Sequence, residues 1–221
     1  MVEIKTYLSI FEKQLQELFQ EKLFFFGIQG SYARGEATEN SDIDVVVILE
    51  NLTPSLLLEY KKMVDSLPFR DKLCGFVSGK EELFHWNTSE LFQFYYDTVP
   101  IFGTLDDLLP LITKDVIKQA VHAGACSIYH SCCHNILHET NAEILKSLYK
   151  SSVFLLQAKS FLETGCYSKT KKELYQRISK EESFIIDISQ KPYEITKQRL
   201  EEFSFLLLQW TSRIITKKSL L

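Results

Sequence analysis

The sequence has little of what flexible linkers and membrane segments require. Only 8 of its 221 residues are Gly and 5 are Pro, which argues against long disordered connections. No run of about 18 uncharged apolar residues is present, so we expect no membrane-spanning helix. Met1–Leu18 is amphipathic and charged rather than a basic stub followed by an apolar stretch, so we expect no signal peptide.

Paired cysteines and dense positive charge are also missing. The five cysteines are odd in number and form no framework of the secreted type, so we interpret them as reduced thiols of a cytoplasmic protein. The formal net charge is -4, and the basic cluster of Lys169, Lys171 and Lys172 is short. A large nucleic-acid footprint is therefore not favoured.

What is present is the composition of an ordinary globular protein, with 45% hydrophobic and 24% charged residues. The first half alternates two kinds of pattern. Helical spacing runs from Ile4 to Glu21 and over residues 54–67 and 81–94. Short apolar runs over 23–29, 43–49 and 73–78 predict buried strands, and 100–103 reads as a return segment.

From about Leu105 onward, long helical patterns dominate. They cover residues 116–139, 142–163, 170–182 and 196–217. We therefore predict a small α/β unit over residues 1–105, followed by a helical bundle over residues 106–221.

Two acids at the start of the second strand carry the most chemical information. Asp42 and Asp44 are two residues apart, so their side chains share one face of the strand. Two carboxylates on one face repel each other unless a positive charge lies between them. A hard divalent cation such as Mg²⁺ takes oxygen ligands and binds triphosphates, so the pair predicts a metal site.

The turn after the first strand complements that pair. Gly30 allows the backbone to approach a ligand closely, and the amides that follow, with the Ser31 hydroxyl, are suited to phosphate oxygens. Because consecutive strands are usually neighbours, phosphate holder and metal holder are expected side by side. That arrangement serves phosphoryl or nucleotidyl transfer, which needs positioning and charge neutralisation.

The spacing Gly-Ser, ten residues, Asp-x-Asp resembles the signature of the polymerase-β-type nucleotidyltransferase superfamily. The fuller stretch GSYARGEATENSDIDVVV is similar to the minimal nucleotidyltransferases and to the kanamycin-type aminoglycoside nucleotidyltransferases. The resemblance implies an α+β fold with a mixed sheet, flanking helices and a helical C-terminal domain. It also implies two metal ions and transfer of NMP with loss of pyrophosphate.

The resemblance also assigns residues. It implies that Gly30 and Ser31 bind the triphosphate of ATP or another NTP, and that Asp42 and Asp44 hold Mg²⁺ or Mn²⁺. Two further nucleotide contacts are considered. Ser41 is one, and Arg34 is the other, although an exposed Arg on a short helix equally suits a surface ion pair.

A third acid sits on the neighbouring strand in the family, and here the sequence departs from the pattern. The strand reads Lys72-Leu73-Cys74-Gly75-Phe76-Val77 and contains no carboxylate. Asp71 is the nearest acid and would share a face with Leu73 if the strand starts early. Asp97 and Glu81 are poorer candidates.

Histidines gather in the second half, where His130, His134 and His138 recur every four residues and so share a helical face. With Cys126 and Cys133 nearby, they suggest a zinc site, although satisfied core histidines explain the pattern equally well. By a rough overlay on the kanamycin-type enzymes, His130 is also a candidate general base towards the acceptor hydroxyl.

Together these observations predict a metal-dependent enzyme that moves NMP, with AMP favoured, to a hydroxyl of a small molecule. Two alternatives stay open: an enzyme that nucleotidylates a protein, and a degenerate nucleotide-binding or partner-binding module without turnover. We expect no membrane partner, and the sequence is compatible with a homodimer.

Overall fold

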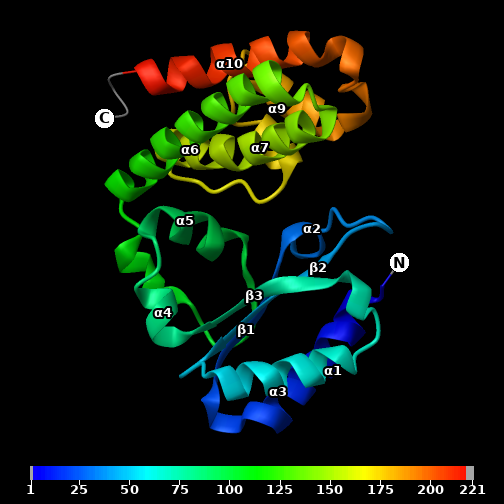
Figure 1. The fold of residues 1–221 in the computed structure, drawn as a ribbon. Coiled ribbons are helices and arrows are strands. Elements are labelled where there is room, and N and C mark those ends of the chain that lie inside the picture. The colour runs from blue at the N-terminus through cyan, green and yellow to red at the C-terminus, as the bar shows by residue number, and fades with distance from the viewer. Residues whose placement is uncertain (1, 218–221) are drawn as a thin grey trace. The chain divides into compact units, whose positions relative to one another are not determined.

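The computed structural model describes residues 2–217, which divide into two compact units. The sheet unit extends to Leu111 and the helical unit begins at Ile112 (Figure 1). The predicted border lay at residue 105. Whether each unit is an independent domain stays a prediction, and each unit is described by itself.

The sheet unit alternates helices and strands, as the sequence predicts. Its elements are α1 (Ile4–Phe19), β1 (Leu23–Gln29), α2 (Gly30–Arg34), β2 (Ile43–Leu49), α3 (Pro54–Asp65), β3 (Leu73–Gly79), α4 (Lys80–Phe84), α5 (Thr88–Asp97) and β4 (Val99–Phe102). Short 3₁₀ turns cover Gln20–Lys22, Arg70–Lys72 and Asp106–Leu111.

The four strands form one mixed sheet in the order β3-β2-β1-β4. Strand β1 is antiparallel to both β2 and β4, whereas β2 and β3 are parallel. This confirms the mixed sheet with flanking helices. Because β1 and β2 are consecutive and paired, the ten-residue spacing of the signature lies in the connection of a single hairpin.

One face of the sheet carries the apolar core. Phe26, Ile28, Ile43, Val45 and Val47 are buried in one cluster with residues of α1 and α3, and Figure 1 shows both helices beneath the sheet. Side chains alternate along a strand. The residues between these core positions, among them Asp44, therefore face the opposite side.

Residues 81–94 are mostly helical, as the sequence predicts, but they form two helices. Helix α4 ends at Phe84, and α5 begins at Thr88 behind a new cap, where the Asn87 side chain accepts a hydrogen bond from the Ser89 amide at 3.1 Å. Asn is a favoured cap residue because its short side chain reaches the first free amides.

The helical unit contains α6 (Lys114–His134), α7 (Ala142–Thr164), α8 (Lys171–Tyr175), α9 (Ser183–Gln190) and α10 (Leu200–Thr216). A π-helical turn, Asn135–Glu139, continues α6, and short 3₁₀ turns cover Pro192–Glu194 and Lys197–Arg199. Helix α6 packs against both α7 and α10. Within residues 2–217 no helix is both long and apolar enough to cross a membrane.

The prediction of a continuous helical pattern over residues 170–182 is wrong. Helix α8 ends at Tyr175 and α9 starts at Ser183. The guanidinium of Arg177 donates to the carbonyl of Tyr167 at 3.1 Å and to the Ser168 hydroxyl at 3.3 Å. These bonds tie the chain after α8 back to the segment that precedes it, so the helical path is not continued.

Candidate active site

The β1–β2 hairpin brings the two halves of the signature together. Gln29, at the end of β1, is the register partner of Asp44 on β2. The next residue, Gly30, has φ +70°, and a Cβ atom added to it would lie 2.1 Å from Oδ2 of Asp44. A side chain at position 30 would therefore meet both backbone strain and a steric clash. Glycine lets the Asp44 carboxylate lie directly against the turn.

Asp42 and Asp44 lie on the same side of β2. Between them Ile43 is fully buried in the core beneath the sheet, so the flanking residues point to the other face. Asp42 is exposed just before the strand begins, and Asp44 is half-buried. The structure thus places both acids at the edge where the Gly30 turn lies.

The two serines of the signature differ in their surroundings. Ser31 is half-buried on α2, and its carbonyl accepts a hydrogen bond from the Glu36 amide at 2.8 Å. Ser41 closes the loop before β2, because its hydroxyl accepts from the Thr38 amide at 2.8 Å. A structural role thus accounts for Ser41, whose predicted nucleotide contact stays a prediction.

Arg34 is engaged by acids of its own unit. Its Nη1 atom donates to both carboxylate oxygens of Asp97, at 2.7 and 2.9 Å, and its Nε atom to Glu36 at 3.3 Å. Burial on its own lowers the pKa of Arg34, but the carboxylates of Asp97 and Glu36 outweigh that effect and raise it. The surface ion pair considered from the sequence is thus a largely buried one.

Asp97 also reaches the Gly30 turn. It is the last residue of α5, its side chain is 10% exposed, and its Oδ2 atom accepts a hydrogen bond from the Gly30 amide at 3.2 Å. From the sequence, Asp97 is a poorer candidate than Asp71 for the third acid. The missed signal is its position at a helix end directly before β4, which pairs with β1.

The third-acid candidate Asp71 is not supported by the structure. Strand β3 starts at Leu73 and not earlier, and Asp71 lies exposed in a 3₁₀ turn. Leu73 pairs with Ile43, whereas Asp44 pairs with Cys74. Because directly paired residues point to the same side of a sheet, Asp44 shares its face with residue 74, and a thiol stands there.

Glu81 is excluded by the direction of the strands. It follows the end of β3, where Gly79 pairs with Leu49. Asp44 lies at the other end of β2, five residues away and therefore about 17 Å along the sheet. No acid of the neighbouring strand or its flanks thus joins the pair.

A family model for the nucleotidyltransferase domain matches residues 8–121, just over half of the chain. The chain belongs to the nucleotidyltransferase domain family. The matched span contains the complete signature, from Gly30 to Asp44.

Two proteins are similar to this nucleotidyltransferase chain. The first is a protein adenylyltransferase, MntA, of Thermococcus cleftensis, 40% identical over 67 residues. The match covers 29% of this chain and 65% of the relative, so less than two thirds of the relative is spanned. The second is a crystal structure of spectinomycin adenyltransferase AAD(9) from Enterococcus faecialis with ATP and spectinomycin. Its TM-score is 0.60 at 15% identity over 95% of this chain and 98% of that chain, a likeness of fold.

The donor set suits the divalent cation that the resemblance implies. Asp42 and Asp44 offer the oxygen ligands that Mg²⁺ and Mn²⁺ prefer, and the missing side chain at position 30 lets the Asp44 carboxylate lie against the turn. Among residues 2–217, no three His, Cys, Asp or Glu side chains gather closely enough to hold a metal ion. The two aspartates would therefore hold a cation together with phosphate oxygens of the bound nucleotide.

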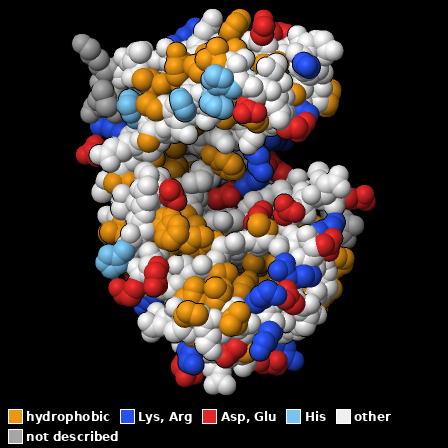
Figure 2. All heavy atoms as spheres, in the orientation of Figure 1, with side chains coloured by type: hydrophobic (Ala, Val, Ile, Leu, Met, Phe, Trp, Pro, Cys, Tyr) orange, Lys and Arg blue, Asp and Glu red, His pale blue; other side chains and the backbone are white. Residues whose placement is uncertain are grey.

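The histidines lie on the surface of the helical unit, where Figure 2 shows pale blue side chains gathered on the visible face. His130, His134 and His138 are exposed. The ring centroids of His134 and His138 are 4.8 Å apart, and those of His130 and His134 are 6.5 Å apart. The zinc site suggested by the sequence is not present among the described residues, and the role of His130 as a base stays a prediction.

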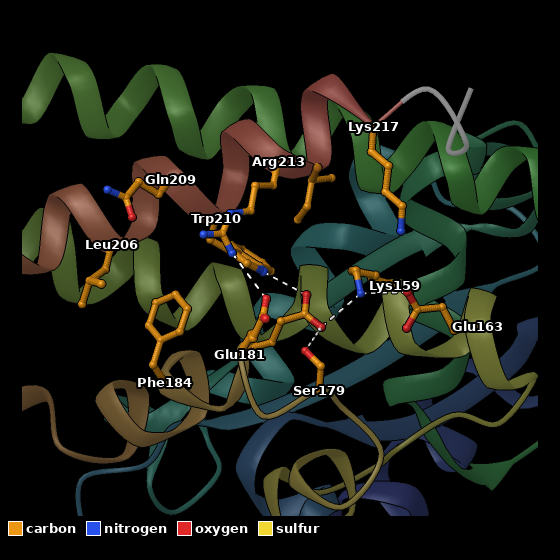
Figure 3. A pocket seen from close by; sticks show the side chains of 12 residues that line it. Lys159, Glu163, Ser179, Glu181, Phe184, Leu206, Gln209, Trp210, Arg213 and Lys217 are labelled. Carbon is orange, nitrogen blue, oxygen red and sulfur yellow. Dashed lines mark hydrogen bonds and ion pairs between the residues drawn. The ribbon is translucent and has the colours of Figure 1, made fainter.

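A crevice of about 500 Å³ opens within the helical unit, between α7, α10 and the chain before α9 (Figure 3). An ion pair between Lys159 and Glu182 forms its floor, with an N–O distance of 3.1 Å and both side chains 12% exposed. The Trp210 indole N–H and the Ser179 hydroxyl also donate to Glu182, each at 3.0 Å. None of the residues singled out by the signature lines this crevice, so the candidate active site is that of the sheet unit.

Proposed function

We propose that this chain is an adenylyltransferase that moves AMP from ATP to a hydroxyl group of a small molecule with release of pyrophosphate. The observation that supports this most is the register of the β1–β2 hairpin, in which Asp44 faces Gln29 and its carboxylate fills the space beside Gly30. This register brings Gly30 and Asp44 together, which supports the proposal that phosphate and metal are bound side by side.

In the proposed reaction, the acceptor oxygen forms a bond to the α-phosphorus while the bond from that phosphorus to the β-phosphate bridging oxygen breaks. Asp42 and Asp44 would hold a divalent cation, which would neutralise phosphate charge and lower the pKa of the attacking hydroxyl. The Ser31 hydroxyl donates to a phosphate oxygen and so helps to orient the triphosphate. The hydroxyl proton leaves to a base, for which His130 remains the candidate.

Replacing the metal acids tests the proposal. With ATP, Mg²⁺ and an acceptor panel beginning with spectinomycin, pyrophosphate release should fall at least ~1000-fold in Asp42→Asn and in Asp44→Asn, because preorganised charge stabilisation is lost. Glu59→Gln, an exposed acid of α3, is the matched control and should react like the wild type. Asp71→Asn should do the same. Unchanged turnover in Asp42→Asn and in Asp44→Asn would reject the proposed metal site.

A protein acceptor is the second candidate, favoured by the 40% identity to a protein adenylyltransferase over 67 residues. ATP labelled at the α-phosphate separates the two. Label that stays with protein on a denaturing gel, dependent on Asp44, indicates a protein acceptor, whereas label that moves into a soluble product indicates a small molecule. A third candidate, a module without turnover, rests on Cys74 in place of a third acid and predicts nucleotide binding with neither product.

A further inference from the structure

We propose that Asp97 and Arg34 form a positioning pair for the phosphate turn, in which Asp97 fixes the Gly30 amide and Arg34 cancels the charge of Asp97 so that a triphosphate can approach. The inference rests on the proposed function for its second half, the approach of the triphosphate. Its first half concerns the protein alone.

The geometry shows a chain of three groups. The Gly30 amide donates to Oδ2 of Asp97 at 3.2 Å, and Arg34 donates to both oxygens of the same carboxylate at 2.7 and 2.9 Å. The side chains of Arg34 and Asp97 are only 14% and 10% exposed. Asp97 thereby links the end of α5 to both ends of the short helix α2.

The turn is held from two sides. Asp97 engages the Gly30 amide, while Asp44 occupies the space next to the Gly30 Cα atom. Gln29 adds a third tie, because its side-chain nitrogen Nε2 donates to the Thr98 hydroxyl at 2.6 Å and to the Phe94 carbonyl at 3.2 Å. The α5–β4 junction therefore determines where the phosphate turn lies.

Electrostatics give Arg34 its role. A buried carboxylate repels an approaching polyanion strongly, because a low-dielectric surrounding screens charge poorly. Asp97 lies within hydrogen-bond distance of the Gly30 amide, in the turn beside which the triphosphate is proposed to dock. Both oxygens of Asp97 are bound to Arg34, so this pair carries no net charge, and the carboxylate keeps its geometric function without repelling the nucleotide. The other acid on the guanidinium, Glu36, lies at Nε, 3.3 Å away, and at 30% exposure its charge is better screened by solvent.

This differs from the direct phosphate contact considered for Arg34 from the sequence, and a double-mutant cycle separates the two. The dissociation constant of a fluorescent ATP analogue with Mg²⁺ is measured without acceptor. Arg34→Ala orphans Asp97 and should weaken binding at least tenfold, whereas Asp97→Asn should weaken it less than about threefold. The double variant R34A/D97N should return to within about threefold of the wild type, because the repelling charge is gone.

The control uses a second Arg–Asp pair of the sheet unit. Arg70 donates to Asp65 at 2.8 Å, but both are exposed, so Arg70→Ala should leave nucleotide affinity unchanged. Arg34→Lys retains the charge and should bind within about threefold of the wild type, with a melting temperature that reports correct folding. A double variant as weak as R34A would show that Arg34 touches the nucleotide itself and would overturn the neutralising role.

A measurement without nucleotide tests the first half. Amide hydrogen exchange of Gly30, followed by NMR, should be at least tenfold faster in Asp97→Ala than in the wild type, because the amide loses its acceptor. In Arg70→Ala it should not change. Unchanged exchange in D97A overturns the positioning role. If the wild type binds no nucleotide, the proposed function and the neutralising role fail together, while the exchange result still decides the positioning role.

Discussion

An ion pair is buried in each unit, and the two pairs differ in what their carboxylates hold. In the helical unit, Glu182 accepts from the side chains of Lys159, Ser179 and Trp210. In the sheet unit, Asp97 accepts from Arg34 and also from the backbone amide of Gly30. The first arrangement ties helices together, whereas the second fixes the path of a turn.

The difference teaches that burial and short distances do not identify a functional ion pair. Both pairs are almost equally enclosed, and by distance alone neither is favoured. What separates them is that the sheet-unit pair is joined to Gly30, whose missing side chain leaves room for Asp44, the acid proposed to bind the metal. Substitutions in one unit at a time therefore test the comparison.

The largest effect is expected from moving the Gly30 turn away from Asp44 and Asp97. Gly30→Ala places a methyl group against Asp44 in a left-handed backbone conformation. We expect the kcat/KM for ATP to fall at least ~100-fold, with about 1–3 kcal/mol lost from the free energy of unfolding. Steady-state kinetics and urea unfolding measure the two.

Gly35→Ala is the matched control. Gly35 has a similar φ of +71°, but a Cβ atom there would meet nothing within 4 Å. It should therefore lose about 1 kcal/mol of stability through strain and retain nearly all its nucleotide turnover. Equal losses of turnover in the two variants would show that strain, and not the approach to Asp44, governs position 30.

A smaller effect, confined to stability, is expected in the helical unit. Lys159→Met leaves Glu182 buried without its cation, so the free energy of unfolding should fall by about 2–4 kcal/mol. The nucleotide affinity should stay within about twofold of the wild type, in contrast to Arg34→Ala. Pairing K159M with Glu182→Gln should recover part of the stability, as a double-mutant cycle in urea would show.

The contribution of Lys159 to the free energy of unfolding should change little with pH below the alkaline range. Burial by itself lowers the pKa of Lys159, but Glu163 and Glu182 outweigh it and raise the pKa above the ordinary 10.5. A raised folded-state pKa gives stability that is complete below 10.5 and is lost as the pH rises through the folded value. A loss of the Lys159 contribution between pH 6 and 9 would contradict this assignment.

The smallest effect should come from supplying the acid that the sheet unit lacks. Cys74→Asp places a carboxylate opposite Asp44 in the register of β2 and β3. We expect the apparent Mg²⁺ affinity in turnover to rise several-fold, because a third oxygen ligand joins the site. Cys74→Ser keeps the size without the charge and should leave the Mg²⁺ dependence unchanged. An aspartate variant that matches the serine variant would place residue 74 outside the metal's reach.

Much of the sheet unit could be predicted because its signals are local. The strands over 23–29 and 43–49 were predicted with their observed bounds, and their apolar runs leave few alternatives. The proximity of Gly30 and Asp44 followed from the pairing of consecutive strands. Helix ends were harder, since the cap at Asn87 and the turn bound by Arg177 act through a few hydrogen bonds that leave the apolar period unbroken.

The contribution of Asp97 could not be predicted, for a different reason. It meets Arg34 across 63 positions of the chain and Gly30 across 67, and no periodic pattern records such a pairing. For Asp71 the register of β2 and β3 decides. Even an earlier start of β3 would have placed Asp71 on the face of Leu73, whereas Asp44 pairs with Cys74 and faces the other side.

The pairing of Gln29 with Asp44 has a consequence for how the chain tolerates change. One hairpin carries both the Gly30 turn and the acids Asp42 and Asp44, which are proposed to bind phosphate and metal. The length of the segment that connects α2 to β2 therefore does not set the distance between them. Lengthening a flexible loop is entropically cheap. Insertions near Gly35 should thus be absorbed, whereas a slip of one residue in the β1–β2 ladder would turn Asp44 into the apolar core.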